Sequence, residues 1–399
     1  MQVQKTDILI SGGGVAGLAA ACAFGTAGFT VIVVDPAAPV TDGAAEGADL
    51  RTTAFLQPSR DVLEKAGLWT KVAAHASALQ VMQIIDAGGT EPVARVQKAF
   101  DAKDISDAPF GWNLPNWLLR REFLARVEEL DTVSFRPGVA TKSVLTRQSE
   151  ARVTLSDASQ ISARLLVAAD GRDSAVRQAV GIGARTTRYG QRALAFAVTH
   201  PVPHNNVSTE IHRSGGPFTL VPLPDRDGSP CSAIVWMEHG PEAKRLAALP
   251  VDAFEAEMNA RSTGLLGPLK LASRRSVWPI ITQIADRMWA ERTALIAEAA
   301  HVVPPIGAQG LNMSLGDVRV LLELAEATPD DLGSKKMLES YHRRRHPEVR
   351  LRVSGIDMLN RASMVGAQPL RDARAQGLKA LYGLPPVRRS LMKLGLGVR

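Results

Sequence analysis

The chain has 399 residues, of which 45% are hydrophobic and 22% charged, with 33 glycines and 24 prolines. This composition predicts a globular protein of about two to three domains, or one large discontinuous domain, and excludes disordered, collagenous and fibrous proteins. The two cysteines, Cys22 and Cys231, are too few and too far apart for a disulfide framework or a cysteine-based zinc site. We therefore expect a cytoplasmic protein without a structural metal.

The net charge of +7 is unevenly distributed along the chain. Residues 335–399 carry 15 basic and 4 acidic residues, a net charge of +11, whereas residues 1–334 carry −4. A nucleic-acid-binding protein would spread basic charge over its body and show a zinc-finger, RNP or helix-turn-helix signature. None is present, so nucleic acid is not an expected partner.

The first elements form a βαβ pattern. The apolar runs Asp7–Ile10 and Thr30–Asp35 are typical of buried parallel strands, and residues 16–27 read as a helix between them. The turn before the helix has the G-x-G-x-x-G spacing, with Gly12, Gly14 and Gly17. In this context the glycines predict a pyrophosphate site at a helix N-terminus, and Asp35 predicts a ribose contact. Because glycines also divide the uncharged run from Ile8 to Val34, we do not expect it to span a membrane.

A second landmark is Leu165–Arg177, where an apolar strand ends in Asp170-Gly171 and places a carboxylate at the edge of the sheet. By itself it equally describes an ordinary strand-to-helix turn capped by aspartate. Residues 193–236 then change to β-branched segments punctuated by proline and glycine, which predicts a largely antiparallel sheet. The third landmark, Ala294–Asn312, reads as a strand, a Pro/Gly loop and a helix beginning near Met313.

Together and in this order, the three landmarks resemble the single-component FAD aromatic-ring hydroxylases with the para-hydroxybenzoate hydroxylase fold. Four further segments are similar to the ubiquinone-biosynthesis branch of that family: Asp49–Ala54, Tyr189–Ala193, Gly216–Leu223 and Pro385–Met392. The resemblance runs nearly end to end. It implies an α/β fold with a discontinuous Rossmann-like FAD domain, a mostly antiparallel substrate domain and a basic helical C-terminal region. The expected ranges are 1–74, 105–180 and 277–334 for the FAD domain, 75–104 and 181–276 for the substrate domain, and 335–399 for the C-terminal region.

The resemblance also implies roles for matching positions. Asp170-Gly171 would touch FAD and help to bind the nicotinamide donor, and the loop from Pro304 to Asn312 would follow the flavin ring. The full expected FAD set is Gly12, Gly14, Val15, Ala16, Gly17, Asp35, Arg51, Arg121, Val139, Asp170, Gly171, Glu298, Gly310, Leu311 and Asn312.

The third landmark departs from the family text. Most members read Gly-Asp-Ala-Ala-His, whereas this chain has Ala297 and Glu298 before Ala299, Ala300 and His301. Ala297 adds a Cβ, and Glu298 keeps the charge on a longer side chain. The change is the sequence support for one alternative, a non-catalytic scaffold that binds FAD or a quinone.

The activity that the resemblance implies is hydroxylation of a polyprenylated phenol or benzoquinol precursor of ubiquinone. Reduced flavin would react with O₂ to give a C4a-hydroperoxide, with NAD(P)H as the expected electron donor. A same-fold hydroxylase or epoxidase acting on another aromatic or lipid substrate remains an alternative. No catalytic side chain is required of the protein itself.

Five pocket candidates each keep a structural alternative: Tyr189, Phe218, Trp236, His301 and Pro304. Tyr189 could touch substrate or anchor the junction between domains. Phe218 and Trp236 could line an apolar cavity with Trp278, although core packing is the more common role of such residues. His301 could act as a base or serve as a hydrogen-bonding structural histidine.

The basic C-terminal region could bring the enzyme to an anionic membrane, at its inner face, or to a partner in a biosynthetic complex. Its ending, Leu391–Val398, places apolar residues beside basic ones, as in interfacial segments. A solvated helical face with some charges paired to the acidic body is the alternative.

Overall fold

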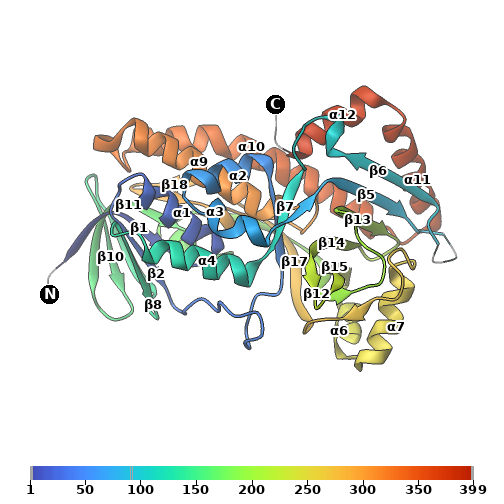
Figure 1. The fold of residues 1–399 in the computed structure, drawn as a ribbon. Coiled ribbons are helices and arrows are strands. Elements are labelled where there is room, and N and C mark those ends of the chain that lie inside the picture. Colours follow the sequence, from blue (N-terminus) through green and yellow to red (C-terminus); the bar gives the residue numbers. More distant parts are fainter. Residues whose placement is uncertain (1–2, 90, 92, 397–399) are drawn as a thin grey trace.

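The computed structural model describes residues 3–89, 91 and 93–396 and has a mixed α/β fold, which confirms the expected fold class. Two large sheets lie side by side along the molecule, with helices packed against them (Figure 1). The described helices are α1 (Val15–Thr26), α2 (Gln57–Lys65), α3 (Trp69–Val72), α4 (Asn116–Glu128), α5 (Ala175–Ala179), α6 (Gly240–Ala248), α7 (Val251–Arg261), α8 (Ala297–Ala300), α9 (Gln309–Ala327), α10 (Lys335–Met364), α11 (Gln368–Tyr382) and α12 (Pro385–Leu396).

The first sheet has a parallel centre, as the βαβ pattern predicts. The strands β1, β2, β8, β11 and β19 pair in parallel, and a hairpin of β9 and β10 extends from β11. In spatial order the sheet contains β18 (Trp289–Ala290), β19 (Thr293–Leu295), β11 (Gln160–Ala168), β1 (Gln4–Ser11), β2 (Val31–Asp35) and β8 (Val133–Pro137), with β10 (Ala151–Leu155) and β9 (Thr141–Thr146) off this path.

The second sheet is antiparallel except where β13 pairs in parallel with β5. Its spatial order is β20 (His301–Val302), β17 (Ser276–Ala285), β12 (Ala184–Thr199), β15 (Ser229–His239), β14 (Pro217–Arg226), β13 (Val207–His212), β5 (Val81–Asp86) and β6 (Val96–Asp101), with β16 (Lys270–Leu271) beside β12. A small third sheet contains β3 (Thr52–Leu56), β7 (Gly111–Pro115) and β4 (Ser77–Leu79).

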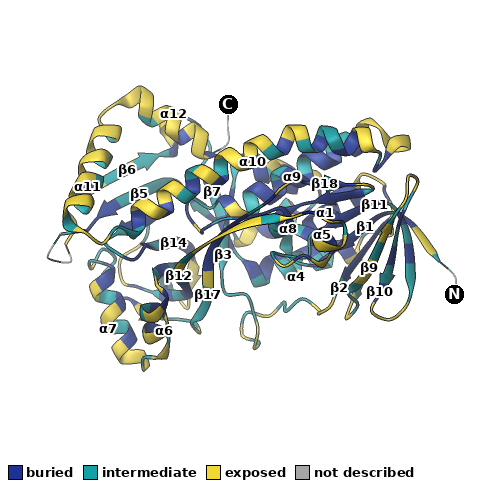
Figure 2. Ribbon diagram, turned by 180° about the vertical axis from the view of Figure 1, so that it is seen from behind, coloured by how far each residue is buried: buried dark blue, intermediate teal, exposed yellow. Residues whose placement is uncertain are grey.

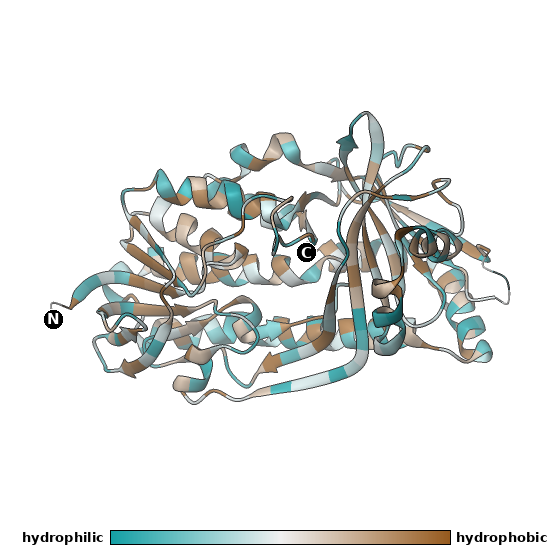
Figure 3. Cartoon of the chain, turned by 90° about the horizontal axis from the view of Figure 1, so that it is seen from below, coloured by the Kyte–Doolittle hydropathy of each residue, from teal (hydrophilic) through white to brown (hydrophobic). Residues whose placement is uncertain are grey.

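Two large hydrophobic cores hold these layers together, beside a small cluster around Leu223. The larger joins the first sheet to α1, α4, α9 and α10, and the alanine-rich α1 is almost completely buried in it. The smaller lies between the second sheet and α6 and α7. Hydrophobic residues run along the strands of both large sheets, whereas the peripheral hairpins and loops are more hydrophilic (Figure 3).

The C-terminal region is helical, as expected, and lies along one side of the molecule. Helix α10 crosses from the first sheet toward the second, and α11 and α12 lie over β5 and β6 (Figure 1). Asp86 of β5 accepts hydrogen bonds from Arg95 and from Arg374 of α11, which attaches α11 to the second sheet. Much of the outer surface of α10–α12 is exposed (Figure 2).

Candidate functional site

The glycine turn before α1 is closely packed on one side and open on the other. Gly12 has φ +113°, and a Cβ there would lie 2.3 Å from the carbonyl oxygen of Ala169; a Cβ on Gly17 would lie 1.9 Å from that of Gly12. Gly14 has no atom within 4 Å of its would-be Cβ and faces a large pocket. No side chain caps α1, so its first amides are available to a ligand. This arrangement fits the pyrophosphate of a dinucleotide.

Asp35 lies at the end of β2 and holds the glycine turn. Its carboxylate accepts hydrogen bonds from the amide of Gly13 at 2.6 Å and from that of Ala37 at 2.9 Å. The amide of Val139 donates to the Asp35 carbonyl. Asp35 and Val139 are not in the pocket lining, whereas Gly14, Val15, Ala16 and Gly17 are. Asp35 therefore shapes the turn, in addition to the ribose contact that we expect of it.

Arg51 enters the pocket from the segment just before β3. Asp49 binds it through two hydrogen bonds of 2.7 Å, and Arg120 of α4 lies 3.7 Å from the same carboxylate. Burial alone would raise the pKa of Asp49, but Arg51 and Arg120 together with Asn116 lower it below its ordinary value. The result is a buried acidic group that fixes two cationic side chains at the pocket wall.

Arg121, the residue expected to contact the cofactor, points elsewhere. Its side chain is 45% exposed, bonds to Glu122 and lies against Trp117. Its neighbour Arg120 lines the pocket instead. Successive side chains on a helix point about 100° apart, so Arg120 and Arg121 face different sides of α4.

The Asp170-Gly171 turn contributes backbone and a cation to the pocket. Asp170 accepts hydrogen bonds from Ser174 and from the amide of Val176, so its carboxylate caps α5. Gly171 and Arg172 line the pocket, and Arg172 Nε lies 3.3 Å from the carboxylate of Glu298. Glu298 therefore lines the pocket, and the guanidinium of Arg172 partly neutralises its negative charge.

Two alanines at this edge adopt left-handed backbone conformations. Ala297 has φ 54° and Ala308 has φ 56°, values that favour glycine. Ala308 precedes α9, which begins at Gln309 and not near Met313 as the sequence predicted. Gly310 and Leu311 therefore line the pocket from the first turn of a helix, which supplies free amides there.

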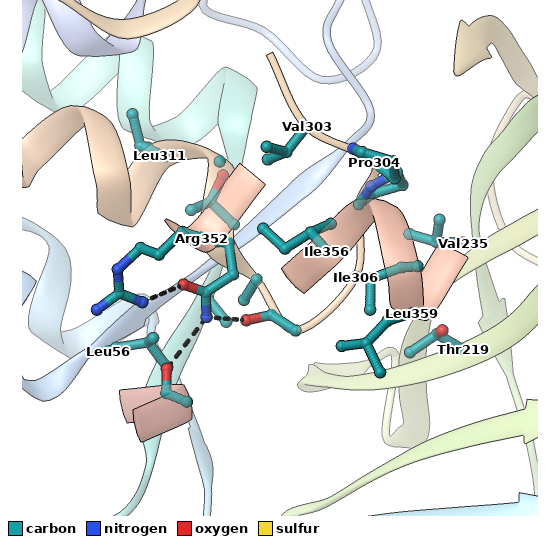
Figure 4. A pocket seen from close by; sticks show the side chains of 18 of the residues that line it. Leu56, Thr219, Val235, Val303, Pro304, Ile306, Leu311, Arg352, Ile356 and Leu359 are labelled. Carbon is teal, nitrogen blue, oxygen red and sulfur yellow. Dashed lines mark hydrogen bonds between the residues drawn. The ribbon is translucent and has the colours of Figure 1, made fainter. Parts of the chain in front are cut away.

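Asn312 does not line the pocket but attaches this helix to β3. Its side-chain amide donates to the carbonyls of Ala54 and Ala308, and its oxygen accepts from the amide of Leu56. Pro304 lies in the loop before α9 and lines the pocket, as Figure 4 shows with Val303 and Leu311.

His301 lines the pocket and forms part of a buried ionic cluster. Its Nε2 lies 2.7 Å from Asp317 Oδ2, while Arg345 Nε donates to Oδ1 of the same carboxylate at 2.9 Å. The amide of Ala297 also donates to Asp317. The cluster joins α8, α9 and α10 behind the pocket wall, which gives His301 a structural role.

The aromatic candidates of the second sheet require correction. Phe218 and Trp236 are buried in the smaller core, whereas Thr219 and Val235, their neighbours in sequence, line the pocket. Successive residues of a strand point to opposite faces, which explains the difference. Trp278 of β17 does line the pocket.

Tyr189 lies outside the pocket lining and links β12 to α10. Its hydroxyl bonds to Thr282 at 2.6 Å and donates to Asp357. Burial and the Asp357 carboxylate raise the pKa of Tyr189 to about 12. The contacts are those of an anchor between the second sheet and the C-terminal region.

The pocket is continuous from the glycine turn to the C-terminal helices. Its volume is about 1920 Å³, and its walls include β5, β13, β14 and β17 as well as α10, α11 and α12. In Figure 4, Ile356 and Leu359 of α10 lie opposite Thr219 and Val235, and Arg352 bonds to Gln309. The sequence did not indicate Glu210, His212 or Arg352 as site residues, because no motif marks them.

Comparisons with known proteins agree on the class. Residues 5–354 match the FAD binding domain family. The chain is 32% identical to ubiquinone hydroxylase UbiL of Rhodospirillum rubrum, over 98% of this chain and 89% of that protein, and 26% identical to 3-demethoxyubiquinol 3-hydroxylase of Escherichia coli, over 100% of both. The structure of p-nitrophenol 4-monooxygenase PnpA from Pseudomonas putida superposes with a TM-score of 0.79 at 18% identity, covering both chains completely.

Proposed function

The chain belongs to the FAD binding domain family and is an FAD-dependent monooxygenase, and we propose that it hydroxylates a polyprenylated phenol or benzoquinol intermediate of ubiquinone biosynthesis. The observation that carries the proposal is the continuous pocket that joins the glycine turn to an apolar chamber and to the leucines of α10–α12. Ordinary ligand pockets measure about 300–1,000 Å³, so this one has room for a dinucleotide and a lipid-like substrate together.

The residues at one end of the pocket suit FAD. Gly12, Gly14 and Gly17 would hold the pyrophosphate, and Arg51 with its Asp49 partner would face the phosphate and ribityl region. The amides of Gly310 and Leu311 in the first turn of α9 would serve the pyrimidine edge of the flavin. When bound and reduced, the flavin activates O₂ and supplies an electrophilic oxygen to an electron-rich ring.

The side chains around the remaining space exclude water and hold the substrate. Val303, Pro304 and Ile306 line the pocket from the loop before α9, and Val235 and Ile356 face them from β15 and α10 (Figure 4). An apolar chamber of this kind protects activated oxygen from water and accommodates a prenyl chain. NAD(P)H supplies the electrons in this proposal.

A lipid substrate must reach the pocket from a membrane. Leu351, Met358 and Leu394 line the pocket and are also 68%, 67% and 62% exposed. They belong to the region of residues 335–399, whose net charge is +11. Both features support peripheral contact with an anionic membrane surface. Within the described residues, no helix is long and apolar enough to cross a bilayer.

The decisive experiment is profiling of quinone intermediates in a deletion strain. Accumulation of a prenylated precursor that lacks one ring hydroxyl supports the proposal, and the chemical structure of that precursor identifies the ring position. Unchanged quinone profiles contradict it.

Assays of the purified protein separate the alternatives. Substrate-stimulated NAD(P)H oxidation and a hydroxylated product distinguish an enzyme from a scaffold that binds FAD or a quinone. A product from a different aromatic or lipid substrate would favour a same-fold hydroxylase or epoxidase outside the ubiquinone pathway.

A further inference from the structure

Five acidic residues are among those that line the pocket, and four of them have arginine partners. Asp49 binds Arg51, and Glu298 binds Arg172. The other two are Asp86, which pairs with Arg95 and Arg374, and Glu348, which pairs with Arg345 and Arg352. Among the described residues, Glu210 has no arginine or lysine partner.

Glu210 instead lies beside a histidine on the same strand. Its Oε1 is 2.7 Å from His212 Nε2, and both side chains are mostly buried, with 11% and 14% of their surface exposed. Nδ1 of His212 is buried and has no hydrogen-bond partner among the described residues. The Glu210 carboxylate therefore has the imidazole of His212 as its neighbour and no arginine or lysine partner among the described residues.

The pair lies on the wall of the substrate chamber. Glu210 is opposite Thr219 in the β13–β14 ladder, and Thr219 is in turn opposite Val235 of β15. Thr219 and Val235 line the same pocket as Pro304 and Ile306, the residues of the loop before α9 (Figure 4). An aromatic substrate ring held between this loop and Thr219 of β14 would therefore lie one strand away from Glu210 of β13.

We infer that Glu210, which lies beside His212, recognises a hydroxyl of the substrate ring and rejects rings that carry a carboxylate. The carboxylate only accepts hydrogen bonds, so it selects a ring with a hydroxyl donor. A ring carboxylate would meet the carboxylate of Glu210, which has no arginine or lysine partner among the described residues, in an apolar chamber where like charges repel strongly. The substrate class is then a neutral phenol or quinol and excludes a hydroxybenzoic acid. This inference rests on the proposed function and narrows it.

Other charged groups lie near Glu210 and His212, but among the described residues none of them forms an ion pair with Glu210. Asp86, the ladder partner of His212 on β5, is bonded to Arg95 and to Arg374 of α11. Arg261 of α7 donates to the carbonyl of Ile211, between the two residues of the pair. Arg374 lines the pocket and donates to the carbonyl of Arg213, the residue after His212, so binding of a ring carboxylate by Arg374 is the competing outcome.

The test measures binding of two small probes to the FAD-loaded enzyme, 4-methylphenol and 4-hydroxybenzoate, by the change that each causes in the flavin absorbance spectrum. We expect the natural protein to bind the phenol more tightly. In Glu210→Gln, which preserves side-chain shape, the ratio of the two Kd values should fall by at least about tenfold. Glu210→Asp, which keeps the charge, should retain most of the ratio.

Glu64→Gln is the matched control, because Glu64 lies in α2, outside the pocket lining, and pairs with Arg60. Its ratio should equal that of the natural protein. An unchanged ratio in Glu210→Gln, or tighter binding of 4-hydroxybenzoate than of 4-methylphenol by the natural protein, overturns the inference. Quinone profiling tests the proposed function separately, so the two can fail independently.

Discussion

At the scale of single residues, the alanines at the cofactor edge are the clearest departure from local preference. An alanine in the left-handed region costs about 1–2 kcal/mol relative to its ordinary conformations, whereas glycine adopts that region freely. Ala297 and Ala308 both carry this strain, and both line the pocket. Strain of this kind persists only where surrounding contacts hold the backbone in place.

We therefore predict that Ala297→Gly stabilises the protein by about 1 kcal/mol in urea unfolding, since it relieves the strain at φ 54°. Adding Glu298→Asp should keep or tighten FAD binding, measured by flavin fluorescence. Ala300→Gly is the control, because Ala300 is buried in α8 and is not among the residues with positive φ. It should destabilise the protein. A loss of FAD affinity in the double variant would show that the pocket is adapted to Ala297 and Glu298.

Asp35 supports a second prediction at this scale. Asp35→Ala removes the acceptor for the Gly13 amide and the expected ribose contact, so FAD should dissociate at least about tenfold more readily on dialysis. Asp42→Ala is the matched control, since Asp42 accepts the amide of Ala44 in an exposed loop. Full flavin retention by Asp35→Ala would contradict the assignment.

The site was predictable from the sequence where a backbone requirement leaves a motif. Gly12 and Gly17 are such positions, because a Cβ at either would collide with backbone, whereas a Cβ at Gly14 would meet no atom. Side-chain direction was less predictable. Arg120 and Arg121 differ only in helical phase, and the facing of Phe218 and Thr219 depends on strand register, which distant pairings set.

At the scale of elements, the parallel centre of the first sheet followed directly from its apolar runs, but the start of α9 did not. The sequence around Gly307–Asn312 contains two glycines, which predicts a longer loop. The helix starts earlier because Asn312 bonds to β3 and to the carbonyl of Ala308. Such tertiary contacts are invisible to local patterns. The Glu210–His212 pair was missed for the same reason, since only the fold brings β13 to the chamber.

The buried cluster of Asp317, His301 and Arg345 supports a prediction about how the helices hold together. Asp317→Ala leaves Arg345 buried without its main partner and should cost about 3–5 kcal/mol in urea unfolding. Combining it with Arg345→Met should recover part of that loss. A double variant no more stable than Asp317→Ala would contradict this account.

The same cluster predicts a pH dependence. Burial would raise the pKa of Asp317, but His301 and Arg345 lower it below its ordinary value of 3.8. A lowered pKa in the folded state stabilises the protein above the unfolded-state value, and the contribution is lost as pH falls through the folded-state value. Stability of the natural protein should therefore drop below about pH 4, and the drop should be smaller in the double variant.

At the scale of the whole molecule, the expected division into an FAD domain, a substrate domain and a C-terminal region remains a proposal. The arrangement of the two large sheets agrees with separate cofactor and substrate regions, because the glycine turn belongs to the first sheet and the apolar chamber to the second. The C-terminal helices close the chamber and carry the basic surplus. The sequence alone indicated the excess of basic residues in the C-terminal region, but only the fold shows that exposed leucines lie at the rim of the pocket.

The last prediction concerns how that rim meets a membrane. Arg389 and Lys393 of α12 are exposed and have no ion-pair partner among the described residues, next to the exposed Leu391 and Leu394. Each basic residue near an anionic surface contributes about 1 kcal/mol of attraction. Arg389→Glu with Lys393→Glu should therefore weaken co-sedimentation with acidic liposomes at low salt by at least about tenfold.

The matched control reverses two charges on the body of the protein. Lys142 of β9 and Lys244 of α6 are exposed and lie outside the pocket lining, so Lys142→Glu with Lys244→Glu changes the net charge equally. If overall charge drove binding, both double variants would lose it equally; if α12 is the contact, only the first should. High salt should abolish binding of the natural protein, because screening shortens the range of the attraction to a few ångströms. No binding to acidic vesicles at low salt would leave a protein partner as the route by which the substrate reaches the pocket.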